Sequence, residues 1–228
     1  MRLMLGPFIY ALLSMTKVFM PKNIPKLSAD HQALIDAGTV NAPDSAKGRL
    51  LQAAASLFKE KGYERTTVRD LGKAVGIQSG SLFHHYPNKE AILRAVMEET
   101  ILLNTALMQA ALAQSNDPAD KVLALIRCEL ESILGTTGAA MTVLVYEWRS
   151  LKEESQLQIL KLRDTYENLW ISTLEEAKEA GSVTIDPAIL RRLLTGALSW
   201  TVNWYRQEGD LTIEELAQMA LSLAVKPN

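Results

Sequence analysis

The sequence predicts an all-α fold, and three observations support this class. Apolar residues recur at spacings of three and four along successive segments, and no segment shows the sustained alternation of a strand. Glycine and proline are sparse, at 12 and 8 of 228 residues, and several of them mark the ends of the periodic segments. Hydrophobic residues make up 48% of the chain and charged residues 22%, as in ordinary globular proteins. We therefore expect about nine helices after residue 44, in one large domain or two smaller ones.

The segment 1–44 is expected to be a flexible extension or linker. Residues 1–22 contain no acidic side chain and are apolar, but Gly6 and Pro7 interrupt the run, which is too short to span a bilayer. We therefore expect a loose tail, or a start codon assigned too early, in preference to a signal peptide or anchor. The following stretch contains proline and asparagine and has at most a short helix near residues 29–37.

Residues 45–105 are expected to form a small helical head. Apolar side chains share one face of a first helix, which ends at Gly62 as its C-terminal cap. Thr67 and Asp70 have the spacing of a capping box at the start of a second helix. A third, short helix is expected over residues 79–86. A long helix then follows to about residue 114.

Residues 106–228 are expected to form a second helical domain. A long amphipathic helix spans residues 151–180. Asp186 stands as a cap residue before a proline, and the helix that it opens is expected to continue to about residue 207. Thr212 and Glu215 have the spacing of another capping box, which opens the last helix.

Residues 67–86 have the pattern of a helix-turn-helix, with two short helices joined by a tight turn at Gly76. They belong to a basic block, because residues 46–90 hold eight Lys/Arg and four Asp/Glu, whereas residues 91–228 hold 12 and 19. A basic block suggests a polyanionic partner, and small residues let a helix approach base edges. A plain helical hairpin is an equally good interpretation of the spacing. The outward-facing residues of the second helix are expected to be Ser79, Gly80, Ser81, His84 and His85.

Catalytic and metal chemistry have little support in the sequence. The chain has a single cysteine, Cys128, and three histidines. His84 and His85 are adjacent, so on a helix they point about 100° apart and rarely share a metal ion. Neither a nucleophile–base pair nor a glycine-rich phosphate loop is evident. We therefore expect no enzyme activity, no metal site and no cofactor.

The run of residues 48–93 resembles the N-terminal domain of TetR-type (TetR/AcrR) transcriptional regulators. The densest parts of the match are TTVRDL at residues 66–71 and SLFHHYPNKE at residues 81–90. The resemblance implies that Thr67 and Lys89 contact DNA phosphates. Many relatives have tyrosine where this chain has Phe83, so this residue lacks the hydroxyl that they direct to phosphate. The recognition-helix residues that the resemblance places in or beside the major groove are Ser79, Gly80, Ser81, Phe83, His84 and His85.

The resemblance also implies that the second domain binds a small effector and forms a homodimer through the last two helices. Packing in an ordinary core is the alternative for each of these apolar and aromatic residues. The residues expected at the dimer interface are Leu193, Gly196, Ala197, Trp200, Leu216, Met219 and Leu223. The residues expected to line an effector pocket are Met141, Tyr146, Trp148, Tyr166, Trp170, Trp200 and Trp204.

The expected function is therefore that of a cytoplasmic, homodimeric repressor that binds double-stranded operator DNA. Residues 200–212 are similar to the corresponding stretch of family members that sense acyl-CoA thioesters during fatty-acid and sterol breakdown. This similarity implies a small apolar or acyl-CoA effector that releases the repressor from its operator. The alternative is a helical adaptor or ligand-binding protein that does not bind DNA. No membrane partner is expected.

Overall fold

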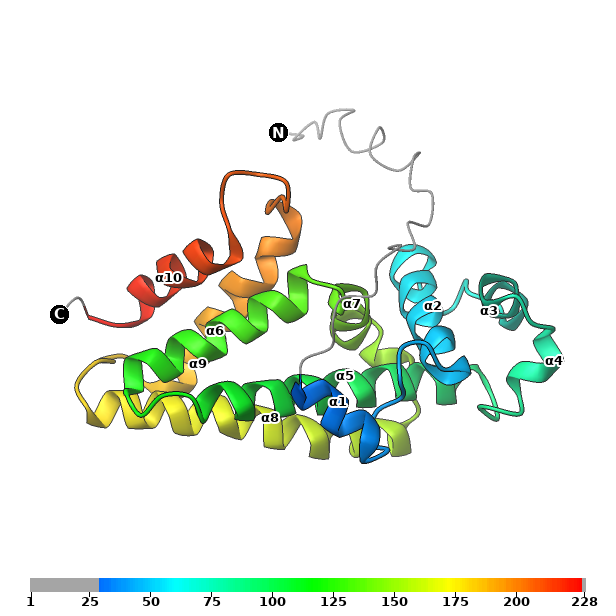
Figure 1. The fold of residues 1–228 in the computed structure, drawn as a ribbon, viewed down its shortest axis with the longest axis horizontal. Helices are drawn as coiled ribbons and strands as arrows, with labels where there is room; N and C mark the ends of the chain where they lie inside the picture. The colour runs from blue at the N-terminus through cyan, green and yellow to red at the C-terminus, as the bar shows by residue number, and fades with distance from the viewer. Residues whose placement is uncertain (1–28, 227–228) are drawn as a thin grey trace, which may run out of the picture.

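The computed structural model describes residues 29–226, which form ten α-helices, two 3₁₀ helices and no strand. The predicted all-α class is therefore confirmed. The described part of the molecule is elongated (Figure 1). The short helices α3 (Val68–Val75) and α4 (Ser79–Leu82) lie at one end, and α10 (Ile213–Ala224) lies toward the other.

Local capping signals set the limits of the first helices. α2 (Ala46–Lys61) begins where the Ser45 side chain accepts a hydrogen bond from the Gly48 N–H, and it ends at Gly62, whose φ is 81°. α5 (Lys89–Leu112) begins where the Asn88 side chain accepts from the Ala91 N–H at 2.8 Å. These starts and stops follow the sequence closely because a cap depends on neighbouring residues alone.

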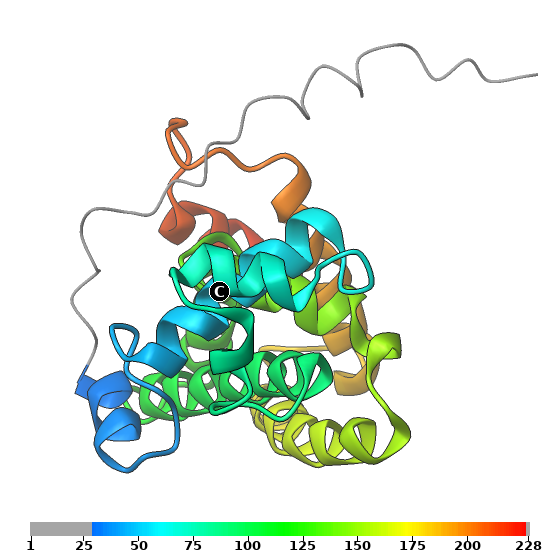
Figure 2. The same ribbon diagram turned by 90° about the vertical axis from the view of Figure 1, so that its right-hand side faces the viewer.

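Longer helices form the body. α8 (Glu153–Glu179) runs beside α5, and α6 (Pro118–Leu134) packs against both (Figures 1 and 2). α7 (Gly138–Tyr146) packs on α2 and α5, followed by a 3₁₀ turn at Trp148–Ser150, while α9 (Pro187–Trp200) packs on α8 and α6. Within the described chain no single helix is long and apolar enough to cross a membrane; α6 and α7 reach that length and composition only as a pair, bent by 91°.

One continuous core joins the head to the body. Buried apolar side chains extend from Leu50 in α2, through Met97 and Met108 in α5, to Trp170 in α8 and Ala224 in α10. The predicted domain boundary after residue 105 falls inside α5, so the helix itself carries the core from one part to the other. The division into residues 45–105 and 106–228 stays a prediction about function.

Part of the predicted flexible extension is packed against the body. α1 (Ala29–Asp36) lies on α5. The backbone N–H of Asn41 donates to Glu99 Oε1 at 3.2 Å, and the Asn41 side-chain amide donates to the same oxygen. These hydrogen bonds and the α1 contact join residues 29–44 to α5, while the flexibility of the extension stays a prediction. The expected tail at residues 1–22 lies outside the described residues.

Two predicted helices are shorter in the structure. The second helix of the motif is expected over residues 79–86, but α4 covers one turn and is followed by i→i+3 turns that end at His85. The next residue, Tyr86, precedes Pro87, and a residue before proline disfavours the helical conformation. The helix expected to reach residue 207 ends at Trp200 and gives way to a 3₁₀ turn, Thr201–Asn203. The Thr201 hydroxyl donates to the Leu198 oxygen at 2.6 Å, and the apolar side chains of Val202 and Trp204 beyond it are exposed, so little burial stabilises a longer helix.

Candidate DNA interface

The turn between α3 and α4 is tight because two glycines permit it. Gly76 has a φ of 74°, in the left-handed region that L side chains rarely adopt. A Cβ atom at Gly72 would lie 2.8 Å from the Ile77 backbone oxygen, so only glycine allows this approach. The Ile77 N–H donates to the Gly72 oxygen at 2.9 Å and closes the turn. These contacts hold α4 across α3 as a helix-turn-helix requires.

One buried side chain anchors α4, and the other residues of α4 and of the turn after it are exposed or half-buried. This segment lies at the end of the molecule that faces the reader in Figure 2. Leu82 is fully buried, whereas Phe83, directly after the helix, is 51% exposed. The structure therefore brings the predicted recognition residues to one accessible end. The exposed or half-buried members of this group are Ser79, Gly80, Ser81, His84 and His85.

Thr67 caps the N-terminus of α3. Its backbone N–H donates to Asp70 Oδ2 at 2.9 Å, and its hydroxyl lies 2.8 Å from the same oxygen and accepts from the Asp70 N–H at 3.1 Å. These hydrogen bonds lower the pKa of Asp70 to about 2, with the Thr67 backbone bond as the largest cause. The predicted contact of Thr67 with phosphate therefore requires its hydroxyl hydrogen to turn away from Asp70.

Lys89 does not point into solvent as the predicted phosphate contact requires. Its Nζ donates to the backbone oxygens of Tyr63 at 2.8 Å and Thr66 at 3.0 Å, with the Glu64 oxygen at 3.4 Å. The ammonium also lies 4.1 Å from the centre of the Tyr63 ring. Because an ammonium has three N–H donors, these carbonyl oxygens occupy it. In this structure Lys89 fixes the loop before α3.

Two basic residues on α3 lie outside the predicted set of DNA-contacting residues. Arg69 and Lys73 are four residues apart, so they share one face of the helix, and both are exposed. Neither forms an ion pair within the described chain. Their spacing on the first helix of the motif was the available signal for a phosphate contact.

Two of the polar contacts between the head and the body involve the segment between α7 and α8. The Tyr63 N–H donates to Glu147 Oε1 at 3.0 Å, and Glu147 directly follows α7. The Lys152 N–H, before α8, donates to Glu90 Oε1 at 3.3 Å. The turn between α7 and α8 therefore holds both the loop before α3 and the first turn of α5.

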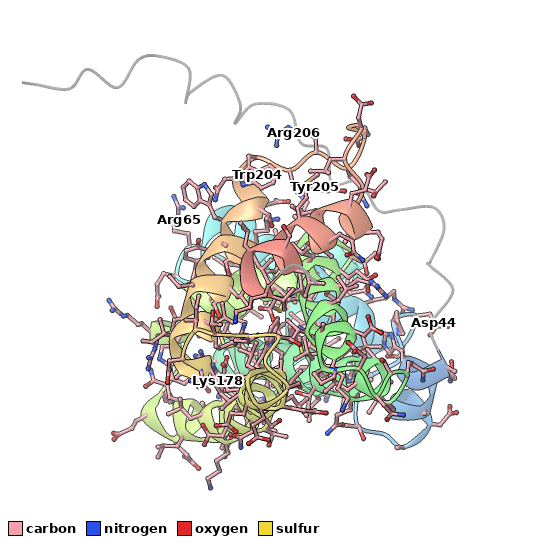
Figure 3. All side chains as sticks on the ribbon, turned by 90° about the vertical axis from the view of Figure 1, so that its left-hand side faces the viewer. Asp44, Arg65, Lys178, Trp204, Tyr205 and Arg206 are labelled. Atoms are coloured by element: carbon pink, nitrogen blue, oxygen red, sulfur yellow. The ribbon has the colours of Figure 1, made fainter. Side chains whose placement is uncertain are left out.

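The residues expected to line one effector pocket are not brought together. Met141, Tyr166 and Trp170 are buried in the body. By contrast, Tyr146 is 73% and Trp200 66% exposed. Trp204 is also exposed, and Figure 3 labels it near the loop that leads to α10. Trp148 is half-buried, with the Arg163 guanidinium 5.9 Å from its ring centre. Sequence reasoning gathered these aromatics by type, whereas their helical faces separate them.

The residues expected at the dimer interface mostly share an exposed apolar surface. Leu223 is 79%, Leu193 59% and Met219 56% exposed, and Gly196, Ala197 and Trp200 are exposed beside them on α9. Leu216 differs, because it is buried within the protomer at 8% exposure. The interface itself remains a prediction.

Comparison with known proteins agrees with this geometry. A family model described as "Bacterial regulatory proteins, tetR family" matches residues 50–96, and one described as "Tetracyclin repressor-like, C-terminal domain" matches residues 115–227. The HTH-type transcriptional repressor KstR2 of Rhodococcus jostii is 30% identical over 179 residues, which are 77% of this chain and 87% of the relative.

Solved structures share the fold over most of the chain. A structure described as superantigen pfit is 55% identical, with a TM-score of 0.77, over 87% of this chain and 98% of that one. The ketosteroid transcriptional regulator KstR2 of Mycobacterium tuberculosis is 25% identical, with a TM-score of 0.73, over 82% and 99%. Fold and site thus define a helix-turn-helix transcriptional regulator. The chain belongs to the TetR family of bacterial regulatory proteins.

Proposed function

We propose that this protein is a homodimeric transcriptional repressor that a small apolar effector releases from its operator. The observation that carries the DNA-binding part is the exposed α4, held on α3 by the close approach at Gly72. Arg69 and Lys73 on α3 supply positive charge next to it. The description of pfit as a superantigen concerns that other protein, and the exposed basic head favours DNA as the partner here.

The exposed apolar surface of α9 and α10 supports the homodimer. Leu193, Trp200 and Leu223 together form the kind of surface that monomeric proteins seldom leave open to water. A two-fold axis through this surface would let two α4 helices enter major-groove segments about one helical turn apart. The residues that lie in or beside the major groove in this arrangement are Ser79, Gly80 and Ser81 of α4, with Phe83, His84 and His85 directly after it.

The proposed effector is an apolar carbonyl or acyl-CoA compound. The likeness of residues 200–212 to acyl-CoA-sensing relatives and the ketosteroid regulator named among the similar structures support this class. The protein acts in the cytoplasm by binding, with no chemical step of its own and no cofactor. Release follows if the effector binds the DNA-free state more tightly than the DNA-bound state.

A gel-shift titration of the full chain with the DNA upstream of its own gene tests this function. If Arg69 and Lys73 of both protomers contact phosphate, the logarithm of the binding constant falls with the logarithm of salt concentration with a slope of about −4. Binding that does not depend on salt concentration, or the absence of binding to the upstream DNA, would favour the alternative of a helical adaptor that does not bind DNA.

A further inference from the structure

Arg191 is a buried charged residue that DNA binding does not use. It lies on α9, and 5% of its side chain is exposed. Its Nε and Nη2 donate to the two carboxylate oxygens of Glu167 on α8, at 2.9 and 3.1 Å. Its Nη2 is also 3.8 Å from the Glu129 carboxylate on α6, which is equally buried. Arg191 therefore connects three helices of the body.

One nitrogen of this guanidinium has no acceptor. Nη1 of Arg191 is buried without a hydrogen-bond partner. The guanidinium stacks on Trp170, 4.3 Å from the ring centre, and the ring centre of Tyr166 is 5.7 Å away. The Trp170 Nε1 is also buried without a hydrogen-bond partner. A buried N–H without a partner is costly, so this position favours a ligand oxygen between two aromatic rings.

The surrounding charges decide which kind of oxygen suits the position. Arg191, Glu129 and Glu167 carry a net charge of −1 when all three are ionised. A carboxylate placed beside Arg191 and Glu129, which are 5% exposed, would add a second negative charge where solvent screening is weak, whereas Glu167 is 39% exposed and is partly screened by water. The oxygen of a ketone, ester or thioester is neutral and accepts the free N–H. The apolar part of such a molecule matches the faces of Trp170 and Tyr166.

We infer that Arg191 anchors the effector, with Nη1 donating to a neutral carbonyl oxygen of an apolar molecule packed against Trp170 and Tyr166. This inference rests on the proposed function and names the chemical group that the effector must carry. Because Arg191, Tyr166 and Trp170 are all buried, the effector enters only when α9 moves away from α8. The same helix carries the exposed Leu193 and Trp200, so entry alters the surface offered to the second protomer.

Three matched probes test the inference on the full wild-type chain by isothermal titration calorimetry. S-octanoyl-N-acetylcysteamine carries a thioester carbonyl, S-octyl-N-acetylcysteamine replaces that carbonyl with a methylene group, and octanoate replaces the thioester with a carboxylate. A hydrogen bond from a charged donor corresponds to a tenfold to hundredfold change in Kd, to order of magnitude. The thioester is therefore expected to bind at least about tenfold more tightly than either of the other probes.

Variants separate anchoring from a purely structural role. Arg191→Lys keeps the positive charge but removes the planar donor fork, so the preference for the thioester over the thioether should fall to about one. Arg192→Lys, at the exposed neighbouring position, should keep the full preference. Glu129→Gln makes the local charge zero and should strengthen octanoate binding about tenfold, which a structural salt bridge alone does not predict. Thermal unfolding checks that each variant is folded.

The inference is overturned if wild type binds the thioester and thioether equally, if it binds none of the probes, or if Arg191→Lys keeps the preference. If Arg191→Lys does not fold, the wild-type probe comparison and Glu129→Gln still decide the question. Operator binding is measured in the same preparations without probe. A protein that binds operator but does not discriminate between the probes contradicts this inference alone, whereas a protein that binds no operator contradicts the proposed function.

Discussion

At the scale of single residues, Lys89 shows what a sequence motif leaves open. Asn88 and Pro87 place Lys89 at the start of α5, and the family resemblance implies that it contacts a DNA phosphate. The structure gives its ammonium three backbone oxygens of the loop before α3 instead. The acceptors are 23 to 26 residues away in the sequence, and no local pattern encodes that approach.

Lys89→Met is expected to destabilise the protein by about 1–3 kcal/mol, because it removes hydrogen bonds from a charged donor. For this variant, the slope of the logarithm of the operator-binding constant against the logarithm of salt concentration should stay near that of wild type. Arg69→Ala should do the opposite, with unchanged stability and a slope reduced in magnitude by about two units, because each protomer of the dimer loses one phosphate contact. Urea unfolding and gel shifts at several salt concentrations measure both. A Lys89 variant with full stability and a reduced slope would restore the phosphate contact.

Asp70 should make the stability of the head depend on pH in acid. Its pKa is about 2 in the folded protein against an ordinary value of 3.8, so its contribution is fully present above pH 3.8 and is lost as the pH falls toward 2. The thermal unfolding temperature of wild type should therefore fall more steeply with decreasing pH over this interval than that of Asp70→Asn. Asp210→Asn, in an exposed loop, serves as the control. Identical slopes for wild type and Asp70→Asn would contradict the assignment.

At the scale of helices, the sequence predicted starts better than ends. The capping boxes at Thr67 and Thr212 were read directly, and both are present. The end of α9 at Trp200 was missed, because apolar spacing continues through Trp204 although those side chains face water. The aromatic residues predicted to line one pocket are separated for the same reason, because spacing does not show which of them face water. Which face of a helix is covered depends on the elements packed against it, and spacing alone does not give this.

Ala197→Glu is expected to weaken the dimer, because it places an unpaired charge on the exposed apolar face of α9. The loss should be at least about 3 kcal/mol, or about a hundredfold in dissociation constant. Sedimentation equilibrium measures it. Gln109→Glu, at an exposed site on α5, adds the same charge elsewhere and should leave dimerisation unchanged. Equal dimerisation of the two variants would place the interface on another surface.

At the scale of the whole molecule, the head and the body share one core and several polar contacts, two of which involve the segment between α7 and α8. Tyr63 takes part in both kinds of contact, since its ring packs on Phe58 and its N–H donates to Glu147. Burial, followed by the nearby carboxylates of Glu64, Glu90 and Glu147, raises the pKa of Tyr63 to about 12. The side chain therefore stays neutral over the physiological range, and the contact to the body does not depend on its ionisation.

Glu147→Ala is expected to loosen the head without unfolding the body. Removing the carboxylate frees the Tyr63 N–H, so hydrogen exchange at that amide should become about tenfold faster. Amides in the middle of α8 should keep their wild-type rates. Glu154→Ala, at an exposed site in the first turn of α8, provides the matched control. Unchanged exchange at Tyr63 would show that the shared core alone fixes the head.

The uninterrupted length of α5 has a consequence for base-pair register. With 24 residues the helix is about 36 Å long, at about 1.5 Å per residue. If it pivots by about 5° at its body end, its head end travels about 3 Å. This distance is close to the ~3.4 Å rise from one base pair to the next. Under that condition a pivot of about 5° would carry α4 out of register with its half-site, and α5 would act as a lever that turns a small displacement in the body into the loss of a matched base sequence.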